Sequence, residues 1–148
     1  MSANDARSGA ELGRPWGLLL GLPGLFFWLL AGLGLETLHA FKQPAYLLDP
    51  VRRLMWTLAH AHGTLLSALA LLIALVVLPR AIHSPRLRRA ADRLFAAGAV
   101  LLPVGFLLGG AWHPEGDPGP GIFLVPAGGI ACGLALGLAC IACLRRPD

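Results

Sequence analysis

Charged residues are scarce in this 148-residue chain. They make up 14% of it, whereas 56% of the residues are hydrophobic and the mean hydropathy is +0.68. A soluble domain of ordinary composition carries about 25% charged residues. The chain also lacks the ~10-residue segments of alternating apolar and polar residues that build a membrane β-barrel. These two absences predict an all-α integral membrane protein.

The sequence has none of the short motifs that mark several classes of enzyme. It contains no GxSxG, no HExxH and no phosphate-binding loop, so hydrolase, metalloprotease and nucleotide-driven pump lack support. It contains no CxxCH and no pair of CxxC motifs, so covalent haem attachment and a zinc ribbon lack support as well. The three cysteines, Cys132, Cys140 and Cys143, are interpreted as small apolar packing residues.

Four apolar runs are present, and each has close to the ~20 residues needed to cross ~30 Å of hydrocarbon. Because the links between them are short, we expect antiparallel neighbours in an up-down four-helix bundle within the lipid bilayer. The spans are placed at residues 16–40, 53–78, 94–112 and 121–144, between tails at 1–15 and 145–148. Residues 80–92, broken by Pro85, are expected to form a short basic hairpin, and residues 113–121 a turn without helix or strand.

Basic residues lie mostly on one side of the predicted bundle. Only Lys42, Arg52 and Arg53 fall on the other side. The majority are Arg7, Arg14, Arg80, Arg86, Arg88, Arg89, Arg93, Arg145 and Arg146. By the positive-inside rule both termini are cytoplasmic, and we expect a bacterial cytoplasmic membrane. No basic patch has the aromatic spacing of a nucleic-acid site, so lipid headgroups are the expected partners and nucleic acid is not.

Ionisable side chains in or near the apolar runs are the best indicators of function. Such groups are expensive in hydrocarbon, and they usually face the bundle interior and serve a ligand, an ion or a cofactor. The predicted topology brings seven of them to the extracytoplasmic face: Glu36, His39, His60, His62, His113, Glu115 and Asp117. Three or four histidines with carboxylates, with His60, His62 and His113 as the candidate ligands, would suit a divalent metal such as zinc or copper.

One face of the second predicted helix combines a histidine with small residues. His60, Gly63, Thr64 and Ser67 recur at spacings of three and four, whereas His62 lies about 200° around the helix from His60. We expect His60 to face inward, since the small residues leave space beneath it for a flat ligand or a close helix. A single buried imidazole on such a face suits a haem axial ligand.

Two further polar groups have open interpretations. Glu36 and His39 share a face of the first helix, where the carboxylate either orients a nearby histidine and moves protons, or forms a polar pair with the first extracytoplasmic loop. His113 either closes a site from above or is an interfacial turn residue. Glycines at four-residue spacing, as at Gly129, Gly133 and Gly137, mark either a close helix contact or a homo-oligomer interface.

Two helices resemble a known family. The run Trp56-Thr-Leu-Ala-His60-Ala-His-Gly-Thr-Leu-Leu-Ser67, in a helix that ends at Leu78-Pro79, resembles the second span of the styrene oxide isomerase and hydroxylaminobenzene mutase group. These are small four-span bacterial membrane proteins with an Ala-His motif at that place. The third span is similar too, with Val104-Gly105-Phe106 before a loop that contains proline and glycine. The similarity covers about a third of the chain.

The resemblance implies a haem b enzyme in which His60 is the axial ligand and Phe106 lies near the cofactor. Ferric iron would act as a Lewis acid and isomerise a small apolar substrate without net redox change. The isomerases carry an asparagine soon after the histidine, where this chain has Thr64 or Leu66, and a tyrosine where Phe106 stands. Other groups, such as Glu36, His39 or His62, would then supply different chemistry.

A second class of function fits the same pattern of residues. The chain would then be a non-catalytic four-helix membrane protein, or an accessory subunit of a larger complex. Its histidines would form hydrogen bonds with one another or hold a divalent metal, and no haem would be bound.

Overall fold

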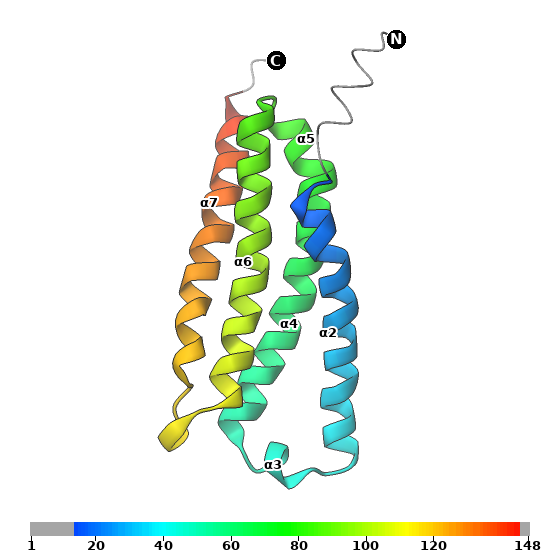
Figure 1. The fold of residues 1–148 in the computed structure, drawn as a ribbon, viewed down its shortest axis with the longest axis vertical. Helices are drawn as coiled ribbons and strands as arrows, with labels where there is room; N and C mark the ends of the chain where they lie inside the picture. Colours follow the sequence, from blue (N-terminus) through cyan, green and yellow to red (C-terminus); the bar gives the residue numbers. More distant parts are fainter. Residues whose placement is uncertain (1–13, 146–148) are drawn as a thin grey trace.

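The computed structural model describes residues 14–145, and in that range it contains helices and no strand (Figure 1). Four helical segments are long and apolar enough to cross a membrane: Trp16–Ala40, Pro50–Ala81, Pro85–Ala111 and Pro120–Leu144. Helices are the stable form there because a bilayer offers no water to hydrogen-bond the backbone. The predicted all-α fold with four membrane helices is confirmed.

The four long helices run up and down in chain order. They are α2 (Trp16–Ala40), α4 (Pro50–Leu72), α6 (Pro85–Ala111) and α7 (Leu124–Leu144). Each packs mainly on its neighbours in the chain, and α2 also touches α6. Figure 1 shows α2 and α7 as the outer members of this row, with the start of α2 and the end of α7 at the same end of the molecule. Both cavities described below border the contact between α2 and α4.

The links at the opposite end are short and partly helical. The first contains α3 (Pro44–Leu47), and the link between α6 and α7 contains two 3-10 turns, η2 (Pro114–Gly116) and η3 (Pro120–Phe123). The backbone N–H of Gly119 donates to the Gly109 carbonyl at 2.8 Å and ties the second link to the end of α6. Residues 113–121 were predicted to form a turn without helix or strand. The structure has two short 3-10 turns there, of which the second runs on to Phe123.

The link that leads into α6 is much shorter than the hairpin predicted at residues 80–92. After α4 the helix continues as a π-helical segment, η1 (Ile73–Val77), and as α5 (Leu78–Ala81), and α6 already begins at Pro85. The π segment precedes Pro79, which has no N–H to donate to the usual carbonyl. Pro85 starts a helix here, because at the first helical position its missing N–H is no loss. Ser84 caps the new helix by accepting from the Leu87 N–H at 3.5 Å.

Glycines let neighbouring helices approach closely, but not at every position where they recur at four-residue spacing. Gly17 and Gly21 are buried, and a Cβ at either would meet α4 or the segment after it within 3 Å. Gly98 and Gly128 bring α6 against α7 in the same way. No atom lies within 4 Å of a Cβ placed on Gly133 or Gly137, so an oligomer contact through that face stays a prediction.

The cysteines differ in their surroundings. Cys132 is buried between α6 and α7, as expected of a packing residue. Cys140 and Cys143 are exposed free thiols near the end of α7, so the packing interpretation does not apply to them within this chain. Their spacing is that of a single CxxC motif.

A buried carboxylate joins the start of α2 to α6. Asp92 is 6% exposed, and its two oxygens accept from the backbone N–H groups of Trp16 at 2.6 Å and Gly17 at 2.9 Å. The first N–H groups of a helix have no partner within the helix, and the helix dipole favours an anion there. Asp92 therefore caps α2 from another helix.

We predict that Asp92→Ala destabilises the protein by about 1–3 kcal/mol, because two backbone donors lose their acceptor. Asp92→Asn keeps one acceptor oxygen and should lose less. Asp117→Ala, which removes an exposed carboxylate in a loop, is the control and should have no effect. Thermal unfolding of the detergent-purified protein measures the difference, and equal midpoints for the wild type and Asp92→Ala would contradict the assignment.

Candidate functional site

A groove between α2 and α4 brings together several of the predicted polar residues. One part of it, about 390 Å³, is lined by Glu36, His39, Tyr46, Thr57 and His60 together with apolar side chains. At His60 and Leu29 it meets a second hollow of about 580 Å³, which has apolar walls apart from His60 and Thr64. We call the two together the His60 groove. His60 lies where its polar and apolar parts meet.

His60 is held in one orientation by the backbone of α2. Its Nδ1 lies 2.8 Å from the carbonyl oxygen of Trp28. A carbonyl can only accept, so Nδ1 carries the proton and the Nε2 of a neutral ring keeps its lone pair. Gly32 leaves space for the ring, since a Cβ there would lie 2.5 Å from His60 Cε1. This is the arrangement in which proteins present an imidazole to a metal, with the second nitrogen fixed by an acceptor.

His62 faces a different helix. Its ring lies 5.1 Å from that of Phe106 on α6, and its Nδ1 lies 2.9 Å from the Leu58 carbonyl one turn earlier. The two histidines of α4 thus contact different helices, as expected from their separation around the helix. Phe106 consequently lies beside His62 and does not line the His60 groove.

The small residues near His60 mostly pack against α2, so little room for a flat ligand remains in the space beneath His60. A Cβ at Gly63 would clash with the Trp28 indole, which occupies the space above this glycine. Ser67 lies against Gly24 of α2 and lines a different cavity. Thr64 alone of the three lines the His60 groove, and its hydroxyl donates to the His60 carbonyl at 2.9 Å. Of the two predicted uses of this face, a close helix is the one found.

Glu36 and His39 do share a side of the groove with His60, but both are exposed within this chain and do not face the interior. Ionisable groups of membrane helices are expected to face the bundle interior, and within the single chain Glu36 does not, because it lies at the open side of the groove. His39 is oriented by the Leu35 carbonyl, 3.3 Å from Nδ1, and its ring meets the edge of Tyr46 at 5.1 Å.

Tyr46 is a candidate site residue that the sequence did not reveal. It is 2% exposed, and its ring stacks on Trp56 with centroids 6.2 Å apart. Its hydroxyl is buried and has no hydrogen-bond partner among residues 14–145. The only tyrosine in the chain stands between Pro44 and Pro50, a pattern that indicates a loop at the membrane surface. The formation of α3 turns its ring into the bundle.

His113 lies in a separate group at the loops. Its Nε2 is 2.8 Å from Asp49 Oδ2, and the Arg52 guanidinium is 3.5 Å from the same oxygen. Neither ring nitrogen of His113 has hydrogen-bond geometry, so the contact with Asp49 is electrostatic. Asp117 is exposed, and the side chain of Glu115 lies outside the described structure. His113 thus connects the link after α6 to the segment before α4.

The predicted ligand set of His60, His62 and His113 is not assembled. In the described part of the chain, no three histidine, cysteine, aspartate or glutamate side chains are close enough together to hold a metal ion. His60 faces α2, His62 faces α6, and His113 faces the loop before α4.

Comparison with known proteins gives no match: no family model, no curated protein and no solved structure is significantly similar to this chain. The function must therefore come from the geometry of the site.

The Asp49 group generates a prediction about pH. The Arg52 backbone N–H donates to Asp49 at 2.9 Å and lowers the pKa of this carboxyl below its ordinary 3.8. Burial opposes this shift, whereas the interactions with His113 and with the Arg52 guanidinium act in the same direction as the hydrogen bond. A lowered pKa stabilises the fold above the ordinary value, and this contribution is lost as the pH falls through the lowered one. Asp49→Ala should therefore lower the unfolding midpoint at neutral pH, and the difference from the wild type should shrink below pH 3.8. A difference that does not change with pH would contradict the role of the charge.

Proposed function

We propose that this small polytopic membrane protein binds haem b through Nε2 of His60. The observation that carries the proposal is the 2.8 Å contact between His60 Nδ1 and the Trp28 carbonyl, which fixes the tautomer and leaves Nε2 for a metal. The resemblance of the second and third spans to the haem-dependent isomerases supports the same assignment.

The residues of the groove fit such a group. The macrocycle needs an apolar wall beside the ligand, and Leu22, Leu25, Phe26 and Leu29 form one next to His60. The hollow of about 580 Å³ there is within the ~300–1,000 Å³ range of ligand sites. His60 would hold the group through Nε2, and bound haem would supply a Lewis-acidic iron to the groove.

The chain's own polar groups would act on the substrate. We infer a redox-neutral isomerisation of a small apolar molecule that carries one oxygen and enters from the bilayer through the open side of the groove. Tyr46 would donate a hydrogen bond to that oxygen, because its buried hydroxyl has no hydrogen-bond partner among residues 14–145. Glu36 and His39, at the open side of the same groove, would accept and return a proton.

We place the groove toward the extracytoplasmic side of a bacterial cytoplasmic membrane. The support comes from the arginines: Arg80 is in α5 and Arg86, Arg88, Arg89 and Arg93 are in the first part of α6, at the end of the molecule where α2 begins and α7 ends. Glu36 and His39 are in the last turns of α2 and Tyr46 is in α3, and these segments lie at the opposite end of the molecule (Figure 1).

The first test is the visible spectrum of protein purified in detergent from haem-replete cells, with a pyridine haemochrome assay. We expect a Soret band at about one haem per chain. His60→Ala should remove it while the helical circular dichroism is retained, and the matched variant His62→Ala should keep it. A colourless wild type would favour the non-catalytic class of function, and an equal loss in the two variants would contradict a single axial ligand.

A second test concerns Tyr46. Because its hydroxyl has no partner in the chain, Tyr46→Phe should leave the stability unchanged or raise it by up to about 1 kcal/mol. The same variant should slow the turnover of an epoxide or an arylhydroxylamine, by about tenfold if one hydrogen bond to the reacting oxygen is lost. The haem content serves as the control and should not change. A loss of stability with unchanged turnover would show that the hydroxyl is structural.

A further inference from the structure

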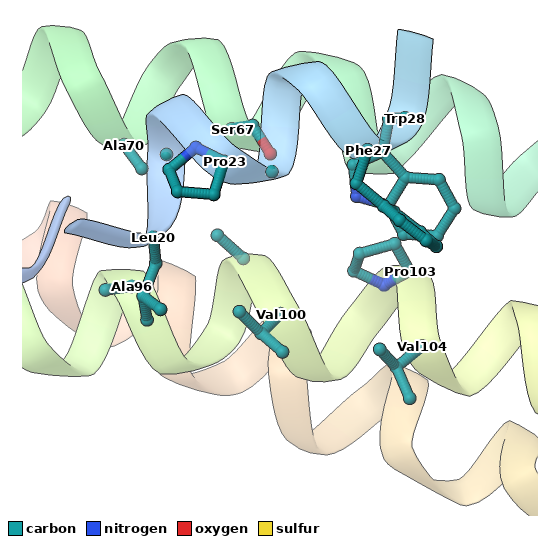
Figure 2. Close-up of a pocket in the computed structure, with 13 residues that line it drawn as sticks. Leu20, Pro23, Phe27, Trp28, Ser67, Ala70, Ala96, Val100, Pro103 and Val104 are labelled. Atoms are coloured by element: carbon teal, nitrogen blue, oxygen red, sulfur yellow. The ribbon is translucent and has the colours of Figure 1, made fainter. Parts of the chain in front are cut away.

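A second cavity lies on the other side of the contact between α2 and α4. It has a volume of about 270 Å³, lies between α2, α4 and α6, and is open along part of its length. Figure 2 shows Leu20 and Pro23 of α2 to the left, Trp28 of the same helix to the right, Ser67 of α4 above, and Val100 and Pro103 of α6 below. Neither His60 nor any other histidine lines it. We call it the Ser67 cavity.

The hydroxyl of Ser67 behaves differently from the other hydroxyls of the long helices. Thr37, Thr57 and Thr64 each donate to the carbonyl four residues earlier, at 2.7, 2.8 and 2.9 Å. This bond is the usual way to satisfy a hydroxyl in a membrane helix. Ser67 is 4% exposed and makes no hydrogen bond with any residue that the structure describes.

The Ser67 oxygen instead points away from α4 toward the cavity (Figure 2). Gly24 of α2 gives it the room, since a Cβ at that position would lie 2.5 Å from Ser67 Oγ. An unmet hydroxyl in apolar surroundings is unfavourable, and a ligand with a hydrogen-bonding oxygen would satisfy it. Ser67 is thus a donor and acceptor at the wall of an otherwise apolar space.

The opposite wall is apolar and contains a break in the helical hydrogen bonding. Pro103 lies inside α6 and has no N–H, so the carbonyl of Ala99 lacks its usual donor. Ala99 and Pro103 both line the cavity. The remaining walls are the rings of Phe27 and Trp28 and aliphatic side chains, which suit a flat apolar molecule.

We propose that the Ser67 cavity binds a small aromatic alcohol, with its ring beside Trp28 and its hydroxyl hydrogen-bonded to Ser67. The volume supports a molecule of this size, because cavities of about 150 Å³ already accept benzene. A lipid acyl chain fits the observations less well, since it carries no group that would satisfy the hydroxyl. The proposal does not depend on haem at His60.

Trp28 separates this site from the His60 groove. Its indole lines the Ser67 cavity, while its carbonyl holds His60 on the other side of the contact. Occupancy of the cavity is therefore expected to change the fluorescence of Trp28, which gives a readout that requires neither haem nor turnover.

The experiment is a fluorescence titration of the detergent-purified full chain with benzyl alcohol, and with toluene as the analogue without an oxygen. The wild type should show saturable binding and prefer the alcohol. Ser67→Ala should weaken binding of the alcohol roughly fivefold, the worth of one ordinary hydrogen bond, and leave toluene unchanged. Thr37→Val is the matched control, because its hydroxyl already bonds within its own helix.

A second pair of variants tests the cavity itself. Ala99→Leu should fill the space and abolish saturable binding of both probes, whereas Ala97→Leu, at an exposed position of the same helix, should bind both like the wild type. Circular dichroism and thermal unfolding check that each variant is folded. Absence of saturable binding in the wild type would overturn the proposal, and so would equal affinity for the two probes or binding that survives in a folded Ala99→Leu.

Discussion

The close contact between α2 and α4 at Trp28 determines both candidate sites. The indole fits over Gly63, and the carbonyl of the same residue accepts from His60. Gly21 and Gly24 continue the contact toward Ser67. Between helices in a bilayer, packing of this kind replaces the hydrophobic effect as the main source of association. A larger residue at Gly63 would separate the helices and remove the support of both His60 and Ser67.

The two sides of this contact offer different chemistry. On one side, His60 presents a free ring nitrogen to a groove that is open along its length and has polar groups at one end. On the other side, a smaller cavity has one hydroxyl in apolar walls. The two sides differ because α6 covers the Ser67 side of the contact. Within residues 14–145, the helices that line the groove on the Glu36 side are α2, α3 and α4.

Carboxylates fix the two ends of the row of helices. Asp92 caps α2 from α6, and Asp49 caps α4 and also contacts His113 from the last link. Both use the unpaired N–H groups that every helix start provides. These contacts join segments that are distant in the sequence, and they set how α2 and α4 lie relative to α6.

The sequence by itself determined the membrane environment, the four helices and their alternating direction, because these follow from hydropathy and short links. It also indicated that His60 and His62 point to different sides, which is a property of one helix. It could not show the helix that begins at Pro85, since proline both breaks helices and starts them. Only the tertiary structure decided that Trp28 fills the space above Gly63, that Glu36 stays exposed, and that Tyr46 and Ser67 carry unmet hydroxyls. These features depend on contacts between helices, and hydropathy and residue spacing do not encode which apolar face meets which.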